Sequence, residues 1–397
     1  MLDKEELQKL ALQTQSIRTV LPHSAEQEHS SAIYLTSSFK FNSAEQAAAR
    51  FNKSEPGNIY GRYTNPNTNE FIAKVCSLEK AEAGIATASG MAAIFTCFSA
   101  LLQQGDHIIN SNALFGPTYK ILDKQLPKWG IEVDYAPIDD FDNWQQLFKP
   151  NTKVFYIETP SNPALALIDI KKLAQLCKSR GVILIVDNAF ASPIVQQPLL
   201  MGADLVIHSA TKYMDGQGRI LGGVIVGNQA LIDQIADFAR FTGSTLSAFN
   251  SWILSKSLET LQLRVEKHCD NAWQIAQALE NTASIEAVRY PFLESHPQYE
   301  LAKRQMSHGG AIITLFLKGG QTQAFQFINA VKIFSITANL GDAKSTITHP
   351  ATTTHSSLAP EQQQQIGITP NMVRLSIGLE DATDLIADIK QAIAVIG

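Results

Sequence analysis

Cysteine and charge are both scarce in this sequence. Charged residues make up 17% of its 397 residues and the net charge is −5, which argues against nucleic acid or an anionic membrane surface as a partner. The few cysteines form no C-x-x-C pair, so a zinc site or a disulfide framework is not expected, and free buried thiols in a reducing cytoplasm are favoured. These four cysteines are Cys76, Cys97, Cys177 and Cys269.

Long hydrophobic runs are almost absent. The one uncharged stretch of near membrane-spanning length covers residues 84–102, GIATASGMAAIFTCFSALL. Its first half is rich in Gly, Thr, Ser and Ala, so it predicts a buried helix behind a Ser-Gly turn rather than a membrane span. The N-terminal MLDKEELQKL also lacks the apolar segment of a signal peptide,. We therefore expect a cytoplasmic protein without a membrane partner.

Between residues 70 and 255 short apolar runs alternate with helical patterns. Runs that are buried on both faces and separated by helices are typical of an α/β fold, with a mostly parallel sheet covered by helices on both faces. The predicted strands are His107–Asn110, Glu132–Ala136, Val154–Glu158, Val182–Val186, Leu205–Ile207 and Gly223–Val226, and the predicted helices are Glu70–Ala81, Thr118–Trp129 and Ile170–Arg180.

The length of the chain predicts more than one domain. Residues 1–60 are expected to form a short helix, at about Asp3–Gln13, and then an irregular N-terminal arm that packs on a partner subunit. Residues 61–255 are expected to form the α/β domain. Residues 256–397 are expected to form a smaller C-terminal α+β domain, with helices Ser255–Asn281, Gln321–Val331 and Ala382–Ile396 and strands Ala311–Leu317 and Val373–Ile377.

A single lysine, Lys212, follows the apolar strand in DLVIHSATKY, and Asp187 ends another buried strand in LIVDNAF. Ligands of such sheets lie beyond the carboxyl ends of the strands, and Ser89-Gly90 opens a helix of the kind that binds phosphate. An amine, a carboxylate and a phosphate cradle suit pyridoxal phosphate, with Phe115 as a candidate to stack on its ring. A nucleotide loop at GQGRILGG is the rival, but it lacks the order of strand, glycine turn and helix that a dinucleotide fingerprint requires.

Seven motifs, in the same order, resemble the Cys/Met-metabolism family of pyridoxal-phosphate enzymes over nearly the whole chain. That resemblance implies the type I fold of PLP-dependent transferases, with pyridoxal phosphate as cofactor and no metal. The motifs are YGRYTNPNTN (60–69), SGMAA (89–93), ETPSNP (158–163), VDNAF (186–190), HSATKY (208–213), HPATTTH (349–355) and VRLSIGLED (373–381).

The resemblance also implies roles at matching positions. Lys212 is expected to bind the cofactor covalently and to shuttle protons, and Asp187 to pair with the pyridine nitrogen. Arg374 is expected to bind the α-carboxylate of the substrate, assisted by Asn339 and Thr354. The other expected cofactor contacts are Ser89, Gly90, Met91, Ser209 and Thr211 at the phosphate, Phe115 on the ring, Asn162 near the ring hydroxyl, and Tyr60 and Arg62 from the neighbouring subunit of a homotetramer built from two active dimers.

Departures from the common family pattern favour one branch, the O-succinylhomoserine sulfhydrylases. Most members carry tyrosine where Phe115 stands, methionine γ-lyases usually have cysteine at the position of Pro117, and cystathionine enzymes commonly have glutamate at the position of Ala338. The expected reaction is γ-replacement on O-succinylhomoserine by sulfide, in methionine biosynthesis. Cystathionine γ-synthase, O-acetylhomoserine sulfhydrylase and methionine γ-lyase remain the alternatives.

Overall fold

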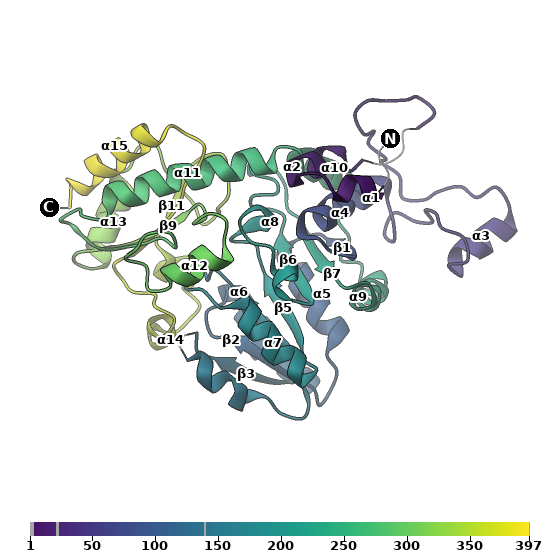
Figure 1. Cartoon of the computed structure of the whole chain (residues 1–397), viewed down its shortest axis with the longest axis horizontal. Coiled ribbons are helices and arrows are strands. Elements are labelled where there is room, and N and C mark those ends of the chain that lie inside the picture. Colours follow the sequence, from purple (N-terminus) through teal and green to yellow (C-terminus); the bar gives the residue numbers. More distant parts are fainter. Residues whose placement is uncertain (1–3, 21–23, 139, 397) are drawn as a thin grey trace. The chain divides into compact units, whose positions relative to one another are not determined.

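The computed structural model describes residues 4–20, 24–138 and 140–396 (Figure 1). Asp3, where the first helix is predicted to begin, lies outside the described residues. The chain divides into two compact units; the predicted domain boundaries near residues 60 and 255 remain predictions. The first unit comprises Met1–Leu101, Ile207–Asp215 and Arg219–Thr260, and the second comprises Leu102–Val206, Gly216–Gly218 and Leu261–Gly397.

One end of a seven-stranded sheet has the order β1-β7-β6, and β6 (Leu205–Ser209) belongs to the first unit from Ile207 onward. Strands β1 (Ala83–Thr87) and β7 (Gly223–Gly227) pair antiparallel. A side chain at Gly223 would collide with the carbonyl oxygen of Ser89, so glycine allows the close backbone approach there. The helices are α1 (Lys4–Gln8), α2 (Leu12–Arg18), α3 (Ala44–Phe51), α4 (Pro66–Glu79), α5 (Gly90–Leu101), α9 (Gln229–Thr242) and α10 (Ala248–Leu258), and α4 packs on α10 and α5 on α9.

The second unit carries the other strands of the large sheet, in the order β5-β4-β2-β3, and all of these neighbours are parallel. They are β2 (His107–Ser111), β3 (Glu132–Ala136), β4 (Thr152–Glu158) and β5 (Ile183–Asp187). Every residue of β2 is buried, which explains the continuous apolar runs in the sequence. Helix α7 (Ile170–Arg180) packs against β5.

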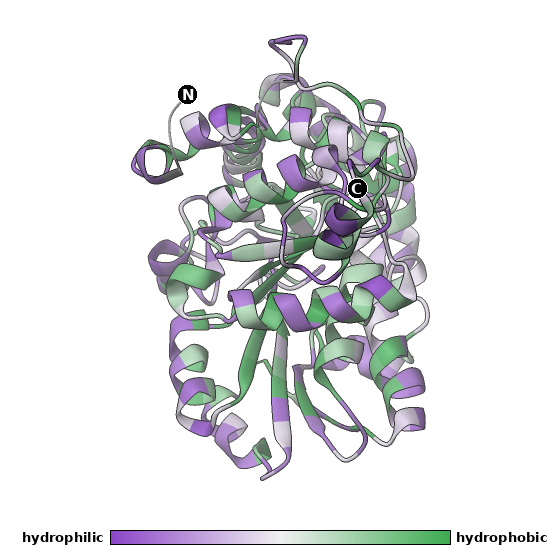
Figure 2. Cartoon of the chain, turned by 90° about the vertical axis from the view of Figure 1, so that its right-hand side faces the viewer, coloured by the Kyte–Doolittle hydropathy of each residue, from purple (hydrophilic) through white to green (hydrophobic). Residues whose placement is uncertain are grey.

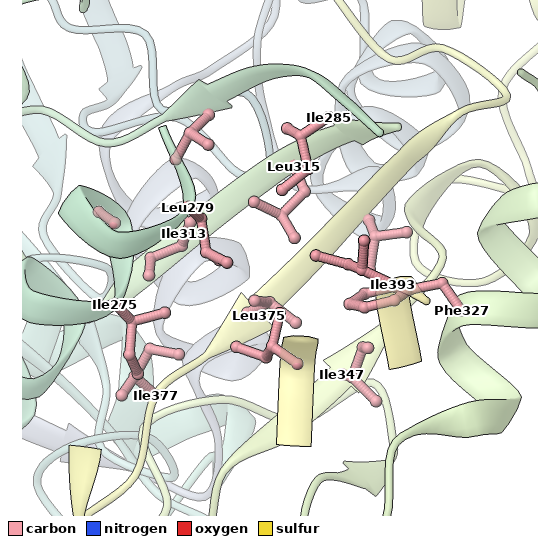
Figure 3. Close-up of a cluster of buried hydrophobic side chains, with 14 of the residues drawn as sticks. Ile275, Leu279, Ile285, Ile313, Leu315, Phe327, Ile347, Leu375, Ile377 and Ile393 are labelled. Carbon is pink, nitrogen blue, oxygen red and sulfur yellow. The ribbon is translucent and has the colours of Figure 1, made fainter. Parts of the chain in front are cut away.

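A second, smaller sheet lies in the same unit, with the strand order β10-β11-β12-β9-β8. Helices α11 (Leu261–Leu279), α13 (Gln321–Ala330) and α15 (Ala382–Ile393) pack with it around one apolar core, in which Ile313, Leu315 and Leu375 are fully buried (Figure 3). The strands are β8 (Ile285–Arg289), β9 (Ile312–Leu317), β10 (Ser335–Ile336), β11 (Thr346–Thr348) and β12 (Met372–Ser376), and the remaining α-helices are α6 (Gly116–Lys120), α8 (Ser192–Val195), α12 (Tyr299–Gln305) and α14 (Pro360–Gln365).

The predicted α/β class, with a mostly parallel sheet and a smaller second sheet, is confirmed, but three predicted helices are wrong in detail. The first helix is interrupted because the amide of Gln15 donates to the carbonyls of Gln8 and Leu10, at 3.2 and 2.5 Å, where α1 ends. The predicted helix 255–281 is broken between α10 and α11. The predicted helix 118–129 is α6 followed by a π-helical turn (Ile121–Gln125) and a 3₁₀ turn (Leu126–Trp129).

Hydropathy follows these elements (Figure 2). The strands of the large sheet are largely hydrophobic, whereas most helices alternate hydrophobic and hydrophilic residues along their length. The uncharged stretch 84–102 begins in strand β1, and most of it is α5, whose central residues are buried. Among the residues that the structure describes, no helix has the length and apolar character needed to cross a bilayer.

Three histidines of the second unit are expected to make the fold sensitive to acid. Burial lowers the pKa of His268, His296 and His355 to about 4, against about 6.5 in an unfolded chain. Between these two values the unfolded chain binds protons that the folded chain does not, so stability is present above pH 6.5 and is lost as the pH falls toward 4. For each histidine, the unfolding free energy is expected to be lower at pH 5 than at pH 7 by about 1–2 kcal/mol.

His268→Asn tests this expectation, because the asparagine NH₂ group lies where Nδ1 does and can replace the bond from the His268 Nδ1–H to the carbonyl of Ile377, 2.7 Å long. Urea unfolding of both proteins at pH 7 and pH 5 should show a smaller acid loss for the variant. An equal loss in the two proteins would contradict the role of this histidine.

Candidate active site

Lys212 lies in the turn that follows β6 (Leu205–Ser209), as the sequence predicts. Its backbone N–H donates to the carbonyl of Ser209 at 3.2 Å, and its side chain is half-buried. The strand is held just before this turn by a buried contact between His208 Nε2 and Glu79 Oε1, which lie 2.5 Å apart. The amine therefore projects from a short turn whose start is fixed by the sheet.

The N-terminus of α5 lies against the same strand end within the first unit. Ser89 Oγ accepts a hydrogen bond from the N–H of Ala92 at 3.1 Å and so caps the helix,. A Cβ added at Gly90 would lie 2.7 Å from the Cβ of Ser209, so any side chain there would fill the space. Thr211 Oγ1 is held 3.1 Å from the N–H of Gly222. A helix N-terminus lined by small and hydroxyl residues fits the phosphate of the predicted cofactor.

Three other predicted cofactor residues also lie in this unit. Met91 follows Gly90 in the first turn of α5 and is half-buried. Tyr60 and Arg62 are exposed, and the guanidinium of Arg62 lies over the rings of Tyr60 and Tyr63, at 5.7 and 4.7 Å from their centroids. The guanidinium of Arg62 also donates to the carbonyl of Arg240. The pair is therefore presented at the surface of its own chain.

In the second unit Asp187 is the last residue of β5 and is 8% exposed. Its Oδ2 accepts from the phenolic O–H of Tyr156 at 3.0 Å, and its Oδ1 accepts from the N–H of Ala189 at 3.0 Å. A buried carboxyl group that is oriented by two donors suits the role predicted for Asp187, which is to pair with the ring nitrogen.

Glu158 is a second buried carboxyl group beside Asp187, and the two are Cα partners at the ends of β4 and β5. Its Oε2 accepts from the N–H of Phe115 at 2.8 Å and its Oε1 from the N–H of Asn162 at 3.1 Å. Burial and the neighbouring Asp187 raise the pKa of Glu158 well above its usual range. The carboxyl thus joins the backbones of two predicted site residues.

Arg374, on β12, is 1% exposed. Its Nη1 donates to Asn162 Oδ1 at 2.9 Å, and its Nη2 donates to the carbonyls of Ala338 and Asn339 at 3.0 and 3.2 Å. These three acceptors hold the guanidinium in one orientation, and its planar fork can then bind a carboxylate through two hydrogen bonds.

Thr354 reaches the same region through His355, since its Oγ1 lies 2.8 Å from His355 Nδ1. His355 is fully buried, and both burial and the charge of Arg374 keep its pKa low. The imidazole is therefore neutral at pH 7.

The structure therefore groups the predicted residues within each unit. The first unit contains Lys212, Ser209, Thr211, Gly90 and Ser89. In the second unit, Asp187 is bonded to Tyr156, and Arg374 is bonded to Asn162 and to the carbonyls of Ala338 and Asn339. The sequence places Glu158 at a strand end, as it does Asp187, but assigns it no role, and it does not single out Tyr156 or His355. Glu158 and His355 stand in the motifs ETPSNP and HPATTTH, and Tyr156 shares a strand face with Glu158 two positions later.

Known proteins of the same kind match nearly the whole chain. The model of the family described as Cys/Met metabolism PLP-dependent enzyme matches residues 13–394. O-succinylhomoserine sulfhydrylase of Pseudomonas aeruginosa is 46% identical over 98% of this chain and 96% of its own length. L-methionine gamma-lyase of Treponema denticola is 40% identical, with 99% of both chains covered.

A solved structure agrees with this match. A putative O-acetylhomoserine (thiol)-lyase from Campylobacter jejuni superposes with a TM-score of 0.93 at 34% identity, covering 97% of this chain and all of the other; its crystal holds a pyridoxyl-lysine phosphate. Pyridoxal phosphate is accordingly the cofactor of this enzyme, and the phosphate cradle at α5 and the buried carboxylate of Asp187 fit it. The chain belongs to the Cys/Met-metabolism family of pyridoxal-phosphate-dependent enzymes.

Proposed function

We propose that the enzyme catalyses γ-replacement, converting O-succinylhomoserine and sulfide to homocysteine and succinate in cytoplasmic methionine biosynthesis. The observation that carries this proposal is the 46% identity, over 98% of this chain, to O-succinylhomoserine sulfhydrylase of P. aeruginosa. Phe115 and Ala338 support it, because both depart from the residues common in the cystathionine enzymes.

Pyridoxal phosphate withdraws electrons from the α-carbon of a bound amino acid. We assign Lys212 to hold the cofactor by its amine, Asp187 to pair with the ring nitrogen, and Phe115 to cover the ring. Asn162 is assigned to the ring hydroxyl. The residues assigned to the phosphate are Ser89, Gly90, Met91, Ser209 and Thr211.

The remaining steps use the side chains of the protein. Arg374 binds the α-carboxylate of the homoserine ester, with Asn339 and Thr354 beside it, and so orients the α-hydrogen. Lys212 acts as the general base that takes this proton. Loss of a proton from the β-carbon expels succinate from the γ-carbon, and sulfide then adds there. A proton returns to the β-carbon, and Lys212 returns one to the α-carbon. Phe115 has no hydroxyl, so it stacks without joining the proton transfers.

Tyr60 and Arg62 are proposed to act on the phosphate of a neighbouring subunit, in a homotetramer of two active dimers. The exposure of both side chains supports this assignment. Sedimentation of the purified holoenzyme at several concentrations tests it, and a monomer at working concentrations would contradict it.

A substrate-pair assay tests the proposed reaction. O-succinylhomoserine is supplied with sulfide or with cysteine, and homocysteine and cystathionine are quantified. We expect homocysteine from sulfide and little cystathionine from cysteine. Efficient formation of cystathionine would instead identify a cystathionine γ-synthase, and a strong preference for O-acetylhomoserine would identify an acetyl-ester enzyme.

Elimination from methionine is the second candidate, because L-methionine gamma-lyase of T. denticola is 40% identical over 99% of the chain. An additional assay with L-methionine alone, scored by methanethiol release, separates the two functions. Pro117, in place of the cysteine usual in those lyases, favours replacement over elimination.

Phe115→Tyr is expected to retain the cofactor while shifting the balance between replacement and elimination. Tyrosine preserves the aromatic face but adds a hydroxyl that can take part in proton transfer. The ratio of homocysteine to elimination products should change several-fold, with one pyridoxal phosphate per chain. Loss of the cofactor from this variant would show that residue 115 does not cover the ring.

A further inference from the structure

We propose that Glu158 is a positioning residue of the active site, whose carboxyl group fixes the separation between the ring-covering Phe115 and the carboxylate-binding Arg374. This inference rests on the roles proposed above for those two residues. Glu158 itself is not assigned any contact with substrate or cofactor.

The first support is the place of Glu158 between two loops. It ends β4, whose parallel neighbour in the sheet is β2. The loop after β2 leads to Phe115, and the loop after β4 contains Asn162. One carboxyl oxygen accepts from the N–H of Phe115 at 2.8 Å, and the other accepts from that of Asn162 at 3.1 Å. A single side chain therefore ties together the loops that follow two adjacent strands.

Phe115 is also the residue before α6, and no side chain caps that helix within its own turn. The bond from its N–H to Glu158 therefore fixes the entry of the chain into α6. A shift of Glu158 would move the phenyl ring together with its backbone.

The loop after β4, which contains Asn162, connects Glu158 to Arg374. Asn162 Oδ1 accepts from Arg374 Nη1 at 2.9 Å, and both residues are buried. Arg374 belongs to β12 of the smaller sheet, so the path from Glu158 through Asn162 connects the two sheets of the second unit. If Asn162 moved, the guanidinium would lose one of the acceptors that orient it.

The alternative is that Glu158 only stabilises the fold. The chain contains a similarly buried carboxyl group with a purely structural role for comparison. Asp388, on α15, is 5% exposed, as is Glu158. It accepts from the N–H of Lys332 at 2.9 and 3.0 Å and from that of Ile333 at 2.8 Å. These bonds join a helix to a loop, and no residue assigned to the site takes part in them. If Glu158 acted only on stability, the two carboxyl groups would behave alike.

The test compares Glu158→Gln with Asp388→Asn in the holoenzyme. A glutamine NH₂ cannot accept, so one of the two backbone N–H groups loses its partner. Cofactor content, the visible circular dichroism of bound pyridoxal phosphate, the melting temperature and the Kd for L-norvaline are measured. L-norvaline has the α-amino and α-carboxylate groups but no γ-leaving group, so its binding does not depend on which ester is the substrate.

We expect Glu158→Gln to keep one cofactor per chain, to change the visible dichroism, and to raise the Kd for L-norvaline at least about 10-fold, since small misplacements in active sites carry large penalties. Both variants should lower the melting temperature by similar amounts. Asp388→Asn should leave the cofactor content, the visible dichroism and the Kd for L-norvaline at wild-type values. Wild-type dichroism and L-norvaline affinity in Glu158→Gln would overturn the proposal.

Glu158→Asp provides a second test if the glutamine variant does not fold. Aspartate keeps the carboxyl group but is one methylene shorter, so it cannot reach both loops, and an intermediate rise in the Kd for L-norvaline is expected. Unchanged affinity in this folded variant would also overturn the proposal. A wild-type enzyme that binds L-norvaline but makes no homocysteine would contradict the proposed reaction and not the role of Glu158.

Discussion

Replacing Lys212 with alanine is expected to lower kcat at least about 10³-fold, because general-base proton transfer and covalent attachment of the cofactor are lost together. Lys212 lies half-buried in the turn after β6, and no other residue is proposed to supply an amine to the reaction. The visible absorption that depends on the lysine–cofactor bond should disappear as well. Turnover of the homoserine ester and an absorption spectrum of the purified variant check both effects.

Lys344→Ala is the matched control, since its side chain is 73% exposed and lies 3.9 Å from Asp342 in a surface ion pair. It should leave kcat and the spectrum unchanged, and both variants should keep the melting temperature of the apoenzyme within a few degrees. Retention of turnover and visible absorption by Lys212→Ala would refute the assignment of this lysine.

Arg374→Ala is expected to have the second largest effect, with kcat/KM reduced about 10²-fold or more through a rise in KM. Its charge-assisted bonds to the substrate carboxylate are each stronger than neutral hydrogen bonds. The variant also removes the donor to Asn162 Oδ1 and to the carbonyls of Ala338 and Asn339. We therefore also expect a loss of about 1–3 kcal/mol in unfolding free energy.

Arg374→Lys separates charge from geometry. Lysine keeps the positive charge but lacks the planar fork, so kcat/KM should recover only in part. Arg304→Lys is the control, because Arg304 forms an exposed ion pair with Asp169 at 3.0 Å, and such pairs contribute little. Steady-state kinetics with the homoserine ester would contradict the assignment if KM for Arg374→Lys equalled that of the wild type.

The regular elements of the large sheet were predictable from local pattern. The buried runs at 154–158 and 205–207 are strands, because β-branched and aromatic residues that are mostly apolar on both faces leave few other options,. The same reasoning failed at residues 118–129 and 255–281, where helical periodicity continues through a π-turn and through the α10–α11 break. Periodicity does not report such breaks, because a helix can end where a side chain bonds to its carbonyls, as the bond from Gln15 to Gln8 shows for α1.

The chemical identity of the site was also present in the sequence. A lysine after one strand, an aspartate after another and a Ser-Gly helix start are all local features, and seven ordered motifs specify the family. The bonds that position these groups were not predictable. Tyr156 contacts Asp187 only because the parallel register places Tyr156 opposite Ile185, and Glu158 meets Asp187 for the same reason.

By itself, then, the sequence determined the fold class and the cofactor, because these depend on residue type and on order along the chain; the roles of the site residues remain proposals. Only the tertiary structure decided that Glu158 joins Phe115 to Asn162, that Asn162 orients Arg374, and that His355 is buried beside this arginine. The bonds from Phe115 to Glu158 and from Arg374 to Asn162 link residues 43 and 212 positions apart, and strand register and sheet packing, rather than local pattern, bring them within hydrogen-bonding distance,.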